Sequence, residues 1–455
     1  MMSSTALPTP QIHGDSSFDE GASRPASASS HRRLKVLVCA YTCSPVQGSE
    51  AGVGWGWVQA ISQYHDLWVI VGAQFQDEIE AQLESLPYLR SRIQFHYIAR
   101  IRFPTLEKLW PPAYLFTYKR QWQAAAFEAA RSLHQQVNFD IVHQLTYVGF
   151  RVPGRLWALS VPFVWGPIGG LEQTTWALLP SLGLRGCLHF TARNLLNDWD
   201  RRFSRLPKRA FRVAEGGIIA ATTGIQQQIR RLYGRESTVI SEIGLPPSGR
   251  HAPGRRHAQE PLRLLWSGLH NPGKALPFLF EALQSLPSRL QWQLTILGDG
   301  PCRANWAGIA EKAGLSDRCE WLGQLPRSVA LETMQEAHAL IVTSVYELTS
   351  TVVVEALANG LPVICPDHCG FKDAVNSSCG VLVNASSPRK LVSGLSQAIE
   401  HIYDENFRFE LARGALLQSR KYEWSAKARA VSDIYYFKTA TGEESAADIR
   451  EVRDF

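Results

Sequence analysis

Apolar and amphipathic segments alternate along the first half of the chain. A continuous apolar run over 35–41 is typical of a buried parallel strand, and a loop rich in glycine and proline follows over 44–54. We expect further helices over 55–64, 76–85 and 120–134, and further strands over 67–72, 93–98, 141–143 and 161–165. Because strands and helices alternate, the pattern predicts an α/β fold with a doubly wound parallel sheet.

The same alternation starts again after residues 246–260, which have no apolar periodicity and are predicted to be an interdomain linker. The expected strands cover 262–266, 293–297, 319–322, 339–343 and 362–365, and the expected helices 275–286, 302–313, 328–336 and 351–358. We therefore predict two facing Rossmann-like domains, over 31–245 and 261–421. A ligand is expected in the interdomain cleft, at the carboxyl ends of the strands.

The two ends of the chain are expected to contribute less to the fold. Residues 1–30 are rich in Ser, Ala and Pro without the apolar core of a signal peptide, so we predict a disordered leader. Residues 422–437 are predicted to form a helix that packs on the N-terminal domain, and 438–455 a polar tail. The longest apolar stretches are shorter than the roughly 18 residues of a membrane-spanning helix, so we expect a cytoplasmic protein whose membrane contacts are peripheral.

Composition and charge narrow the function. With 455 residues, 45% hydrophobic and 19% charged, the chain can bury large cores, and its eight cysteines are too few for a disulfide scaffold. The net charge of +6 is too mild for a dedicated nucleic-acid-binding protein, and we find no nucleic-acid-binding motif. The excess is local: residues 31–245 hold 24 basic and 15 acidic side chains, against 14 and 15 in 261–421. This asymmetry favours an anionic membrane surface or acceptor as partner of the first domain.

The most informative motif lies over 343–364, where a strand, a polar turn and a helix follow one another. The helix is expected to start near Thr349 or Ser350, with Glu347 just before it and Glu355 inside it. Free backbone N–H groups at such a start bind anions, which suggests a diphosphate site. The alternative is that the hydroxyl only caps the helix and Glu355 is only solvated.

This Glu-x7-Glu spacing, followed by Ala-Leu-Ala-Asn-Gly-Leu-Pro-Val-Ile, resembles the donor site of retaining GT-B glycosyltransferases of family 4, the glycosyl transferases group 1. Further segments are similar to that family in order along the chain, at 47–55, 140–143, 266–274, 298–301 and 322–325. The resemblance covers about residues 34–437. It implies a GT-B fold and a sugar transferred, with retention, from a nucleotide-diphosphate donor.

The resemblance also implies roles for particular residues. Glu347 would contact the donor-sugar hydroxyls, Lys274 would neutralise the leaving diphosphate and Glu355 would hold the ribose. His143 alone is more often a packing residue, but the resemblance favours contact with the donor sugar, so the expected catalytic residues are His143, Lys274 and Glu347. The other expected donor-binding residues are Gly48, Ser49, Gly268, His270, Leu325, Leu348, Thr349, Ser350 and Thr351. The expected acceptor-side residues are Glu50, Gly169 and Gly170.

Two departures from the family pattern affect the donor site. Leu269 stands where the family usually has an arginine, which removes a phosphate clamp and leaves Lys274, the helix start and His270 to bind the diphosphate. The usual Gly-Phe-Gly after the first glutamate is replaced by 348–350, Leu-Thr-Ser. The alternative function is therefore a non-catalytic protein with the GT-B fold that binds a nucleotide or a glycan.

A metal and a membrane are the remaining candidates for partners. Cys365, His368, Cys369 and Cys379 could bind zinc, but His368 and Cys369 are adjacent, so we favour buried thiols and expect neither a metal nor another cofactor. Residues 184–212, together with a second patch over 97–122, are basic and rich in leucine and aromatic residues, typical of membrane-surface binding. A solvated basic face is the alternative. Membrane binding would suit a lipid-linked saccharide acceptor in cell-surface polysaccharide biosynthesis.

Overall fold

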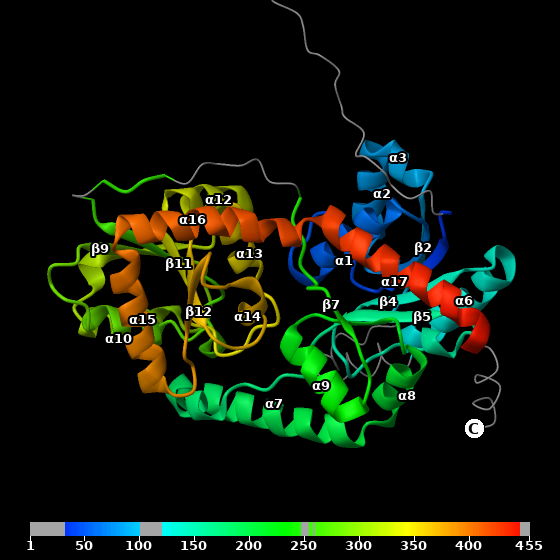
Figure 1. Ribbon diagram of the computed structural model, residues 1–455, viewed down its shortest axis with the longest axis horizontal. Helices are drawn as coiled ribbons and strands as arrows, with labels where there is room; N and C mark the ends of the chain where they lie inside the picture. Colours follow the sequence, from blue (N-terminus) through cyan, green and yellow to red (C-terminus); the bar gives the residue numbers. More distant parts are fainter. Residues whose placement is uncertain (1–31, 101–120, 247–253, 258–259, 446–455) are drawn as a thin grey trace, which may run out of the picture. The chain divides into compact units, whose positions relative to one another are not determined.

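The computed structural model describes residues 32–100, 121–246, 254–257 and 260–445, and two parallel sheets form its framework (Figure 1). The leader (1–30), part of the linker and most of the 97–122 patch lie outside these residues.

The first sheet contains seven parallel strands in the order β3-β2-β1-β4-β5-β6-β7. They are β1 (Lys35–Ala40), β2 (Asp66–Gly72), β3 (Ile93–Ile98), β4 (Ile141–Thr146), β5 (Phe163–Ile168), β6 (Ile218–Ala220) and β7 (Thr238–Val239). Successive β1 residues point to opposite faces: Val36 and Val38 join a core with α1 (Ser49–Ser62), α2 (Gln76–Ser85) and α17 (Trp424–Ser445), whereas Leu37 and Cys39 join a core on the other face. That second core contains α6 (Gln123–Val137), α8 (Arg205–Val213) and α9 (Thr223–Tyr233).

The second sheet has six parallel strands in the order β10-β9-β8-β11-β12-β13. They are β8 (Leu262–Ser267), β9 (Trp292–Leu297), β10 (Cys319–Gly323), β11 (Ala339–Ile341), β12 (Val363–Pro366) and β13 (Gly380–Val383). Leu264 packs with α10 (Pro277–Gln284), α11 (Arg303–Lys312) and α15 (Pro388–Ile402). Leu265, on the opposite face, packs with α12 (Arg327–Glu336), α13 (Thr351–Ala358), α14 (Phe371–Ala374) and α16 (Glu405–Ser419). Both sheets are thus covered by helices on each face, which confirms the predicted fold class of two Rossmann-like domains.

Helix α1 starts earlier than the sequence pattern suggests. The glycine-rich stretch after residue 48 is helical from Ser49, not a loop up to residue 54. A Cβ added at Gly54 would lie 2.1 Å from the Thr42 carbonyl oxygen, and one at Gly56 would lie 2.2 Å from the Trp424 ring. These glycines therefore let the helix pack closely against Thr42 and Trp424 and do not form a turn. Because glycine has a low helix propensity, they lower the stability of the helix modestly.

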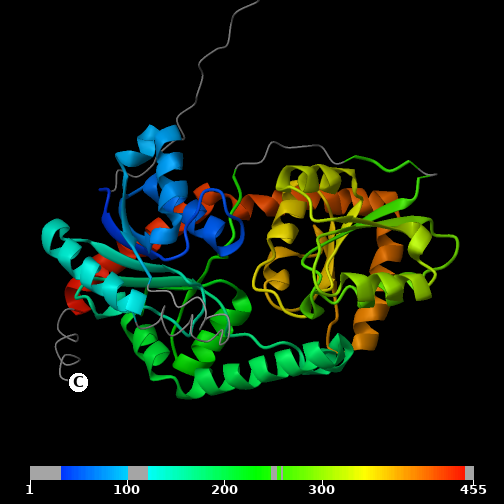
Figure 2. The same cartoon turned by 180° about the vertical axis from the view of Figure 1, so that it is seen from behind.

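Helix α17 packs on the first sheet, where Val431, Ile434 and Tyr435 join the core beside α1 (Figure 2). It runs on to Ser445, so the first part of the predicted polar tail, 438–455, continues the helix.

The basic segment 184–212 forms two helices, α7 (Gly183–Phe203) and α8, separated at Ser204, whose backbone is extended. One face of α7 packs on the second domain, whose sheet is β8–β13 and which is also called the second lobe. The ring of Phe190 lies against Gly273, and the Arg193 guanidinium lies 3.6 Å from the ring centroid of Tyr346. The opposite face carries exposed apolar side chains: Leu184, Leu188, Leu195, Leu196, Trp199 and Phe203.

Candidate functional site

The loops that follow β8 and β11 are bound to each other, because these strands are neighbours in the sheet. Trp266 Nε1 donates to Thr343 Oγ1 (3.0 Å), and that hydroxyl donates to the Lys274 carbonyl (2.7 Å). The backbone N–H of Val345 donates to the Gly273 carbonyl (2.9 Å). The two carboxyl-terminal loops therefore form one rigid unit at the edge where α/β sheets bind ligands.

This unit brings Lys274 and Glu347 together. The Lys274 Nζ forms an ion pair with the Glu347 carboxylate, and their side chains are 23% and 22% exposed. The Lys274 chain runs past Gly268, where an added Cβ would lie 3.4 Å from Lys274 Cδ. Two of the three residues predicted to be catalytic are thus in contact, partly open to solvent, although they are 73 positions apart.

Helix α13 begins next to this pair. Ser350 is its N-cap with extended backbone and no side-chain cap hydrogen bond, and Thr351 is the first helical residue, as the sequence predicts. In the part of the chain that the structure describes, the N–H groups of Leu348, Ser350 and Thr351 donate to no protein acceptor. The resulting group of free donors lies at the positive end of the helix.

Thr349 differs from the prediction. Its N–H donates to Glu242 Oε1 (3.1 Å) and its hydroxyl to Glu242 Oε2 (3.0 Å), so Thr349 does not offer its N–H group to a diphosphate. Glu242 follows β7, is buried, and lies near Lys427, whose Nζ donates to the Ser241 carbonyl (2.6 Å). Burial raises the pKa of Glu242 and lowers that of Lys427. Sequence reasoning missed Glu242, because a lone carboxylate at the end of the first domain carries no pattern.

The second motif carboxylate, Glu355, is held in place by a cation. Arg327 Nε donates to Glu355 Oε1 at 2.8 Å, and the Glu355 side chain is only 11% exposed. Leu325, two residues before Arg327, is half-buried against the core beneath α13. The loop that follows β10 thus lies beside α13.

From the first domain, Gly169 meets the loop 343–350 (the donor loop) directly. A Cβ at Gly169 would lie 2.6 Å from Leu348 Cδ2, so the end of the Leu348 side chain would have to move to admit a larger residue. Gly169 also forms a bridge with Gly149, and Gly170 has a φ of +85° that favours glycine. Gly170 is therefore favoured by its backbone conformation, and Gly169 by its close approach to the Leu348 side chain.

At the start of α1, Gly48 and Ser49 are exposed, and Ser49 has a left-handed φ of 57°. Glu50 accepts a hydrogen bond from the Val148 N–H (2.8 Å), and burial raises the pKa of Glu50 to about 7. A carboxyl group that changes charge near neutrality thus lies between α1 and the loop after β4.

His143 does not occupy the position predicted for a sugar contact. Its side chain is fully buried in β4, with Nδ1 2.6 Å from the Tyr435 hydroxyl and Nε2 2.7 Å from the Gly166 carbonyl oxygen. Burial lowers its pKa to about 4. Because both nitrogens are used and no surface is exposed, His143 packs between α17 and the sheet in this arrangement, and its catalytic role stays a prediction.

His270 is also removed from the predicted role of phosphate helper. It is fully buried among Trp266, Trp306 and Trp321, and its ring centroid lies 5.4–5.6 Å from the centroid of each tryptophan ring. Neither nitrogen of the His270 ring has a hydrogen-bond partner in the described residues. Burial lowers its pKa, partly offset by the Leu297 backbone and by Asp299. A ring that is enclosed by three tryptophans and has no exposed surface does not contact a phosphate in this arrangement.

The cysteines form no disulfide in the described residues, and all eight are free. Within the same residues no group of three or more His, Cys, Asp or Glu side chains is arranged to hold a metal ion. Cys365, Cys369 and Cys379 are buried, and His368 Nε2 lies 2.9 Å from the Ser344 carbonyl oxygen. The four residues considered for zinc therefore contribute to packing and hydrogen bonding.

Comparison with known proteins gives this geometry a context. Residues 252–409 match the family model described as glycosyl transferases group 1. A D-inositol 3-phosphate glycosyltransferase of Xylanimonas cellulosilytica is 26% identical over 242 residues, which cover 49% of this chain and 57% of that enzyme. The match thus spans little more than half the length of that relative.

Solved structures share the fold over nearly the whole chain. Sucrose-phosphate synthase of Thermosynechococcus elongatus superposes with a TM-score of 0.59 at 16% identity, covering 90% of this chain and 100% of that one. HepE of Anabaena, in complex with UDP-glucose, gives a TM-score of 0.54 at 17% identity, covering 88% and 99%. At these identities the likeness shows the fold, which is GT-B.

Proposed function

We propose that this chain, which has the GT-B fold and whose residues 252–409 belong to the glycosyl transferases group 1, transfers a sugar from a nucleoside-diphosphate donor to a glycan or lipid-linked acceptor. One observation carries the proposal: the Lys274–Glu347 pair lies beside the free N–H groups at the start of α13. A cation and a helix N-terminus stabilise a departing diphosphate, and a carboxylate accepts hydrogen bonds from sugar hydroxyls. The complex of HepE with UDP-glucose supports this class of donor.

In this proposal the protein positions its substrates and supplies charge. Lys274 and the α13 donors would stabilise the charge that develops on the leaving diphosphate, so the reaction would need no divalent metal ion. The acceptor would approach past Gly169 beside Leu348, on the same side as the leaving group, and the anomeric configuration would be retained. Glu355, fixed by Arg327, would hold the ribose hydroxyls.

A donor panel tests the proposal. Each nucleoside-diphosphate sugar is added to the protein in thermal unfolding, and the correct donor raises Tm because it binds the folded state only. Glu355→Ala should reduce that shift, whereas Glu332→Ala, exposed on α12, should leave it unchanged. If no nucleotide sugar raises Tm, the proposed donor site is wrong.

The second candidate is a protein that binds a nucleotide or glycan without turnover, and Leu269 is the observation that favours it. Its side chain is 57% exposed where the family usually has an arginine. The two functions differ in one measurement: a binding protein gives the Tm shift but releases no nucleoside diphosphate from the donor, with or without an acceptor.

We also propose that the exposed face of α7 and α8 contacts an anionic membrane on the cytoplasmic side, in the synthesis of a cell-surface glycan. No helix in the described residues is long and apolar enough to cross a membrane. Leu188, Trp199 and Phe203 are 61%, 64% and 60% exposed, next to the exposed Arg202, Arg205 and Lys208. Apolar side chains beside cations are the combination that binds anionic bilayers.

A further inference from the structure

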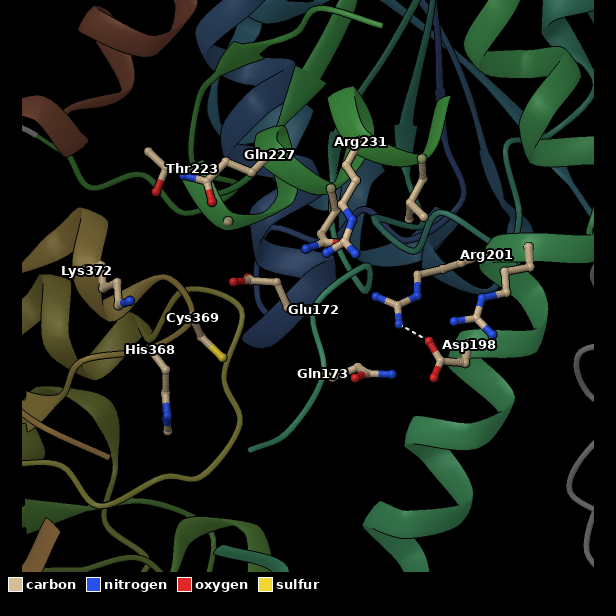
Figure 3. A pocket seen from close by; sticks show the side chains of 14 residues that line it. Glu172, Gln173, Asp198, Arg201, Thr223, Gln227, Arg231, His368, Cys369 and Lys372 are labelled. Carbon is tan, nitrogen blue, oxygen red and sulfur yellow. Dashed lines mark hydrogen bonds and ion pairs between the residues drawn. The ribbon is translucent and has the colours of Figure 1, made fainter. Parts of the chain in front are cut away.

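A polar cavity of about 630 Å³ lies between α7, α9 and the loop 368–372 (Figure 3). Its walls combine Arg201, Arg202 and Arg231 from the two helices with Glu172 after β5 and Lys372 from the second lobe. Figure 3 shows side chains from both lobes lining the same space. It is not the Lys274–Glu347 site, since neither residue lines it.

Three of the cationic side chains in this cavity form no ion pair with a described residue. Arg201 is bound to Asp198 by an ion pair and to the Leu171 carbonyl (2.9 Å), so its charge is compensated. The guanidinium groups of Arg202 and Arg231 and the Lys372 ammonium are exposed and form no ion pair with any described residue. An anion in the cavity could therefore accept hydrogen bonds from arginine side chains that are not paired with a carboxylate of the described residues.

The side chains of the remaining wall can form hydrogen bonds with hydroxyl groups. Thr223, Gln227 and Arg231 follow one another at i, i+4 and i+8 along α9, so they share one face, and Gln228 and Gln173 also line the cavity. Glu172 is fixed because its carboxylate accepts from Thr222 Oγ1 (3.0 Å) and packs against Gly224, where an added Cβ would lie 2.0 Å from Glu172 Oε1. Burial raises the pKa of Glu172.

The cavity adjoins the donor loop. The Gly370 N–H donates to the Leu348 carbonyl (2.9 Å), and the His368 ring is hydrogen-bonded to the Ser344 carbonyl. The loop that closes the cavity on one side is therefore bound to the segment that carries Glu347. A molecule in the cavity lies one loop away from the proposed donor sugar.

We propose that this cavity binds the acceptor through an anionic group, and that the acceptor is a hydroxyl-rich molecule carrying a phosphate or a carboxylate. Arg231, Arg202 and Lys372 bind the anion, and Glu172 with the α9 amides binds the hydroxyls. The assignment of this ligand as acceptor rests on the proposed function, whereas the anion site itself does not.

Binding of four probes in the absence of donor tests the site. Titration calorimetry with glucose 6-phosphate, glucuronate and glucose should show binding of at least one anionic sugar, and at least tenfold weaker binding of glucose. The two anionic probes distinguish phosphate from carboxylate, and inorganic phosphate alone measures the part due to the anion. Failure of both anionic sugars to bind at millimolar concentration, or equal binding of glucose, overturns the proposal.

Matched variants on one helix locate the site. Arg231→Gln should weaken the anionic probe at least tenfold, and Lys372→Gln should weaken it as well. Arg230→Gln is the control, because Arg230 is paired with Glu236 and does not line the cavity. Equal effects of Arg230→Gln and Arg231→Gln would overturn the assignment.

A parallel Tm measurement with the donor panel separates this inference from the proposed function. Arg231→Gln should leave the donor shift unchanged. If no donor binds while the anionic sugar binds and is lost in Arg231→Gln, the anion site stands and the transferase proposal fails. If the donor binds but no anionic sugar does, the transferase proposal stands and this inference fails.

Discussion

At the scale of single residues, the proposed donor site has Leu269 at the position where the family usually has an arginine. Lys274 is the cation next to Glu347, and Leu269 extends into solvent where a second cation would reach a phosphate. His270 cannot replace it, since its ring is enclosed by three tryptophans. In the proposed function, the charge on the diphosphate would thus be met by one lysine and the N–H groups at the start of α13.

Leu269→Arg should therefore tighten donor binding. The side chain is 57% exposed, so the longer arginine causes no clash, and one charge-assisted hydrogen bond contributes about 1.5–3 kcal/mol, or roughly tenfold or more in Kd. Calorimetry with the donor measures the change, with Leu269→Gln as the uncharged control. Equal affinities for the arginine and glutamine variants would show that no phosphate lies near residue 269.

Two buried histidines predict how stability depends on pH. Burial lowers the pKa of His143 from 6.5 to about 4, and that of His338 to about 3, and His338 Nδ1 accepts from the Arg263 N–H (3.0 Å). The unfolded chain takes up these protons near pH 6.5 while the folded chain does not. The contribution of these neutral histidines to the free energy of unfolding is therefore fully present above pH 6.5 and is lost as pH falls toward 4.

His143→Gln should remove part of this dependence. Below pH 6.5 the slope of the free energy of unfolding against pH should fall by about 1.4 kcal/mol per pH unit, the contribution of one proton. Urea unfolding at pH 7, 6 and 5 measures it, and His189→Gln, on α7, is the control. An unchanged slope would mean that His143 is protonated in the folded state.

The placement of site residues was predictable where they follow neighbouring strands, and not where burial by a distant segment decides. Lys274, Glu347, Ser350 and Thr351 lie together as the sequence suggests, because neighbouring strands present their loops at one edge. His143 looked like a strand-end ligand, but its burial depends on α17, nearly three hundred positions away (292). No local pattern records that contact.

At the scale of elements, α7 has two different faces. Phe190 and Arg193 pack on the second lobe near the donor loop, and Asn194 and Asn197 are buried, whereas the opposite stripe is apolar and exposed. The sequence predicted one basic helix and left the membrane and solvent alternatives open. The exposed leucines and Trp199 favour the membrane, because a solvated face would not need them.

Trp199→Ser with Leu195→Ser should weaken membrane binding. These side chains are 64% and 58% exposed, so the fold should tolerate the change while the apolar area available to a bilayer falls. Flotation with phosphatidylserine vesicles at low salt should recover the wild type and much less of the variant. Leu417→Ser, equally exposed (61%) on α16, is the control, and equal recovery of all three proteins would contradict membrane binding through α7.

Glycines in helices show why element boundaries were harder to predict than elements. The run of glycines after residue 48 looked like a phosphate loop, yet α1 passes through it because Gly54 and Gly56 lie against Thr42 and Trp424. A glycine gives the same local signal in a turn and in a close helix contact. Only the partner surface distinguishes the two.

At the scale of the whole molecule, Glu242 connects the end of the first domain to the donor loop. Its carboxylate holds Thr349 at 3.0–3.1 Å, and Trp57 Nε1 donates to its carbonyl (2.9 Å). The two sheets were predictable from the apolar runs in the sequence, since each run forms a strand that is buried in its own domain. This cross-connection, between positions 107 apart, was not.

Glu242→Ala should lower both stability and donor affinity. The Thr349 N–H and hydroxyl would lose their buried acceptor, which costs about 1–3 kcal/mol for each unsatisfied group, and the loop beside Glu347 would lose its anchor. Tm and the donor Kd are measured together, with Glu332→Ala as control. A lower Tm with unchanged donor affinity would show that Glu242 supports the fold without positioning the donor loop.

The most direct test of the central claim is donor-dependent sugar transfer in Lys274→Met and Glu347→Gln. The nucleotide sugar that raises Tm is supplied with a mixed glycan acceptor, and release of nucleoside diphosphate and the glycosylated product are both measured, with Lys312→Met, exposed on α11, as control. Removing a group that stabilises the developing charge should lower kcat by about 10²–10³ in Lys274→Met. Wild-type turnover in both site variants would contradict the account.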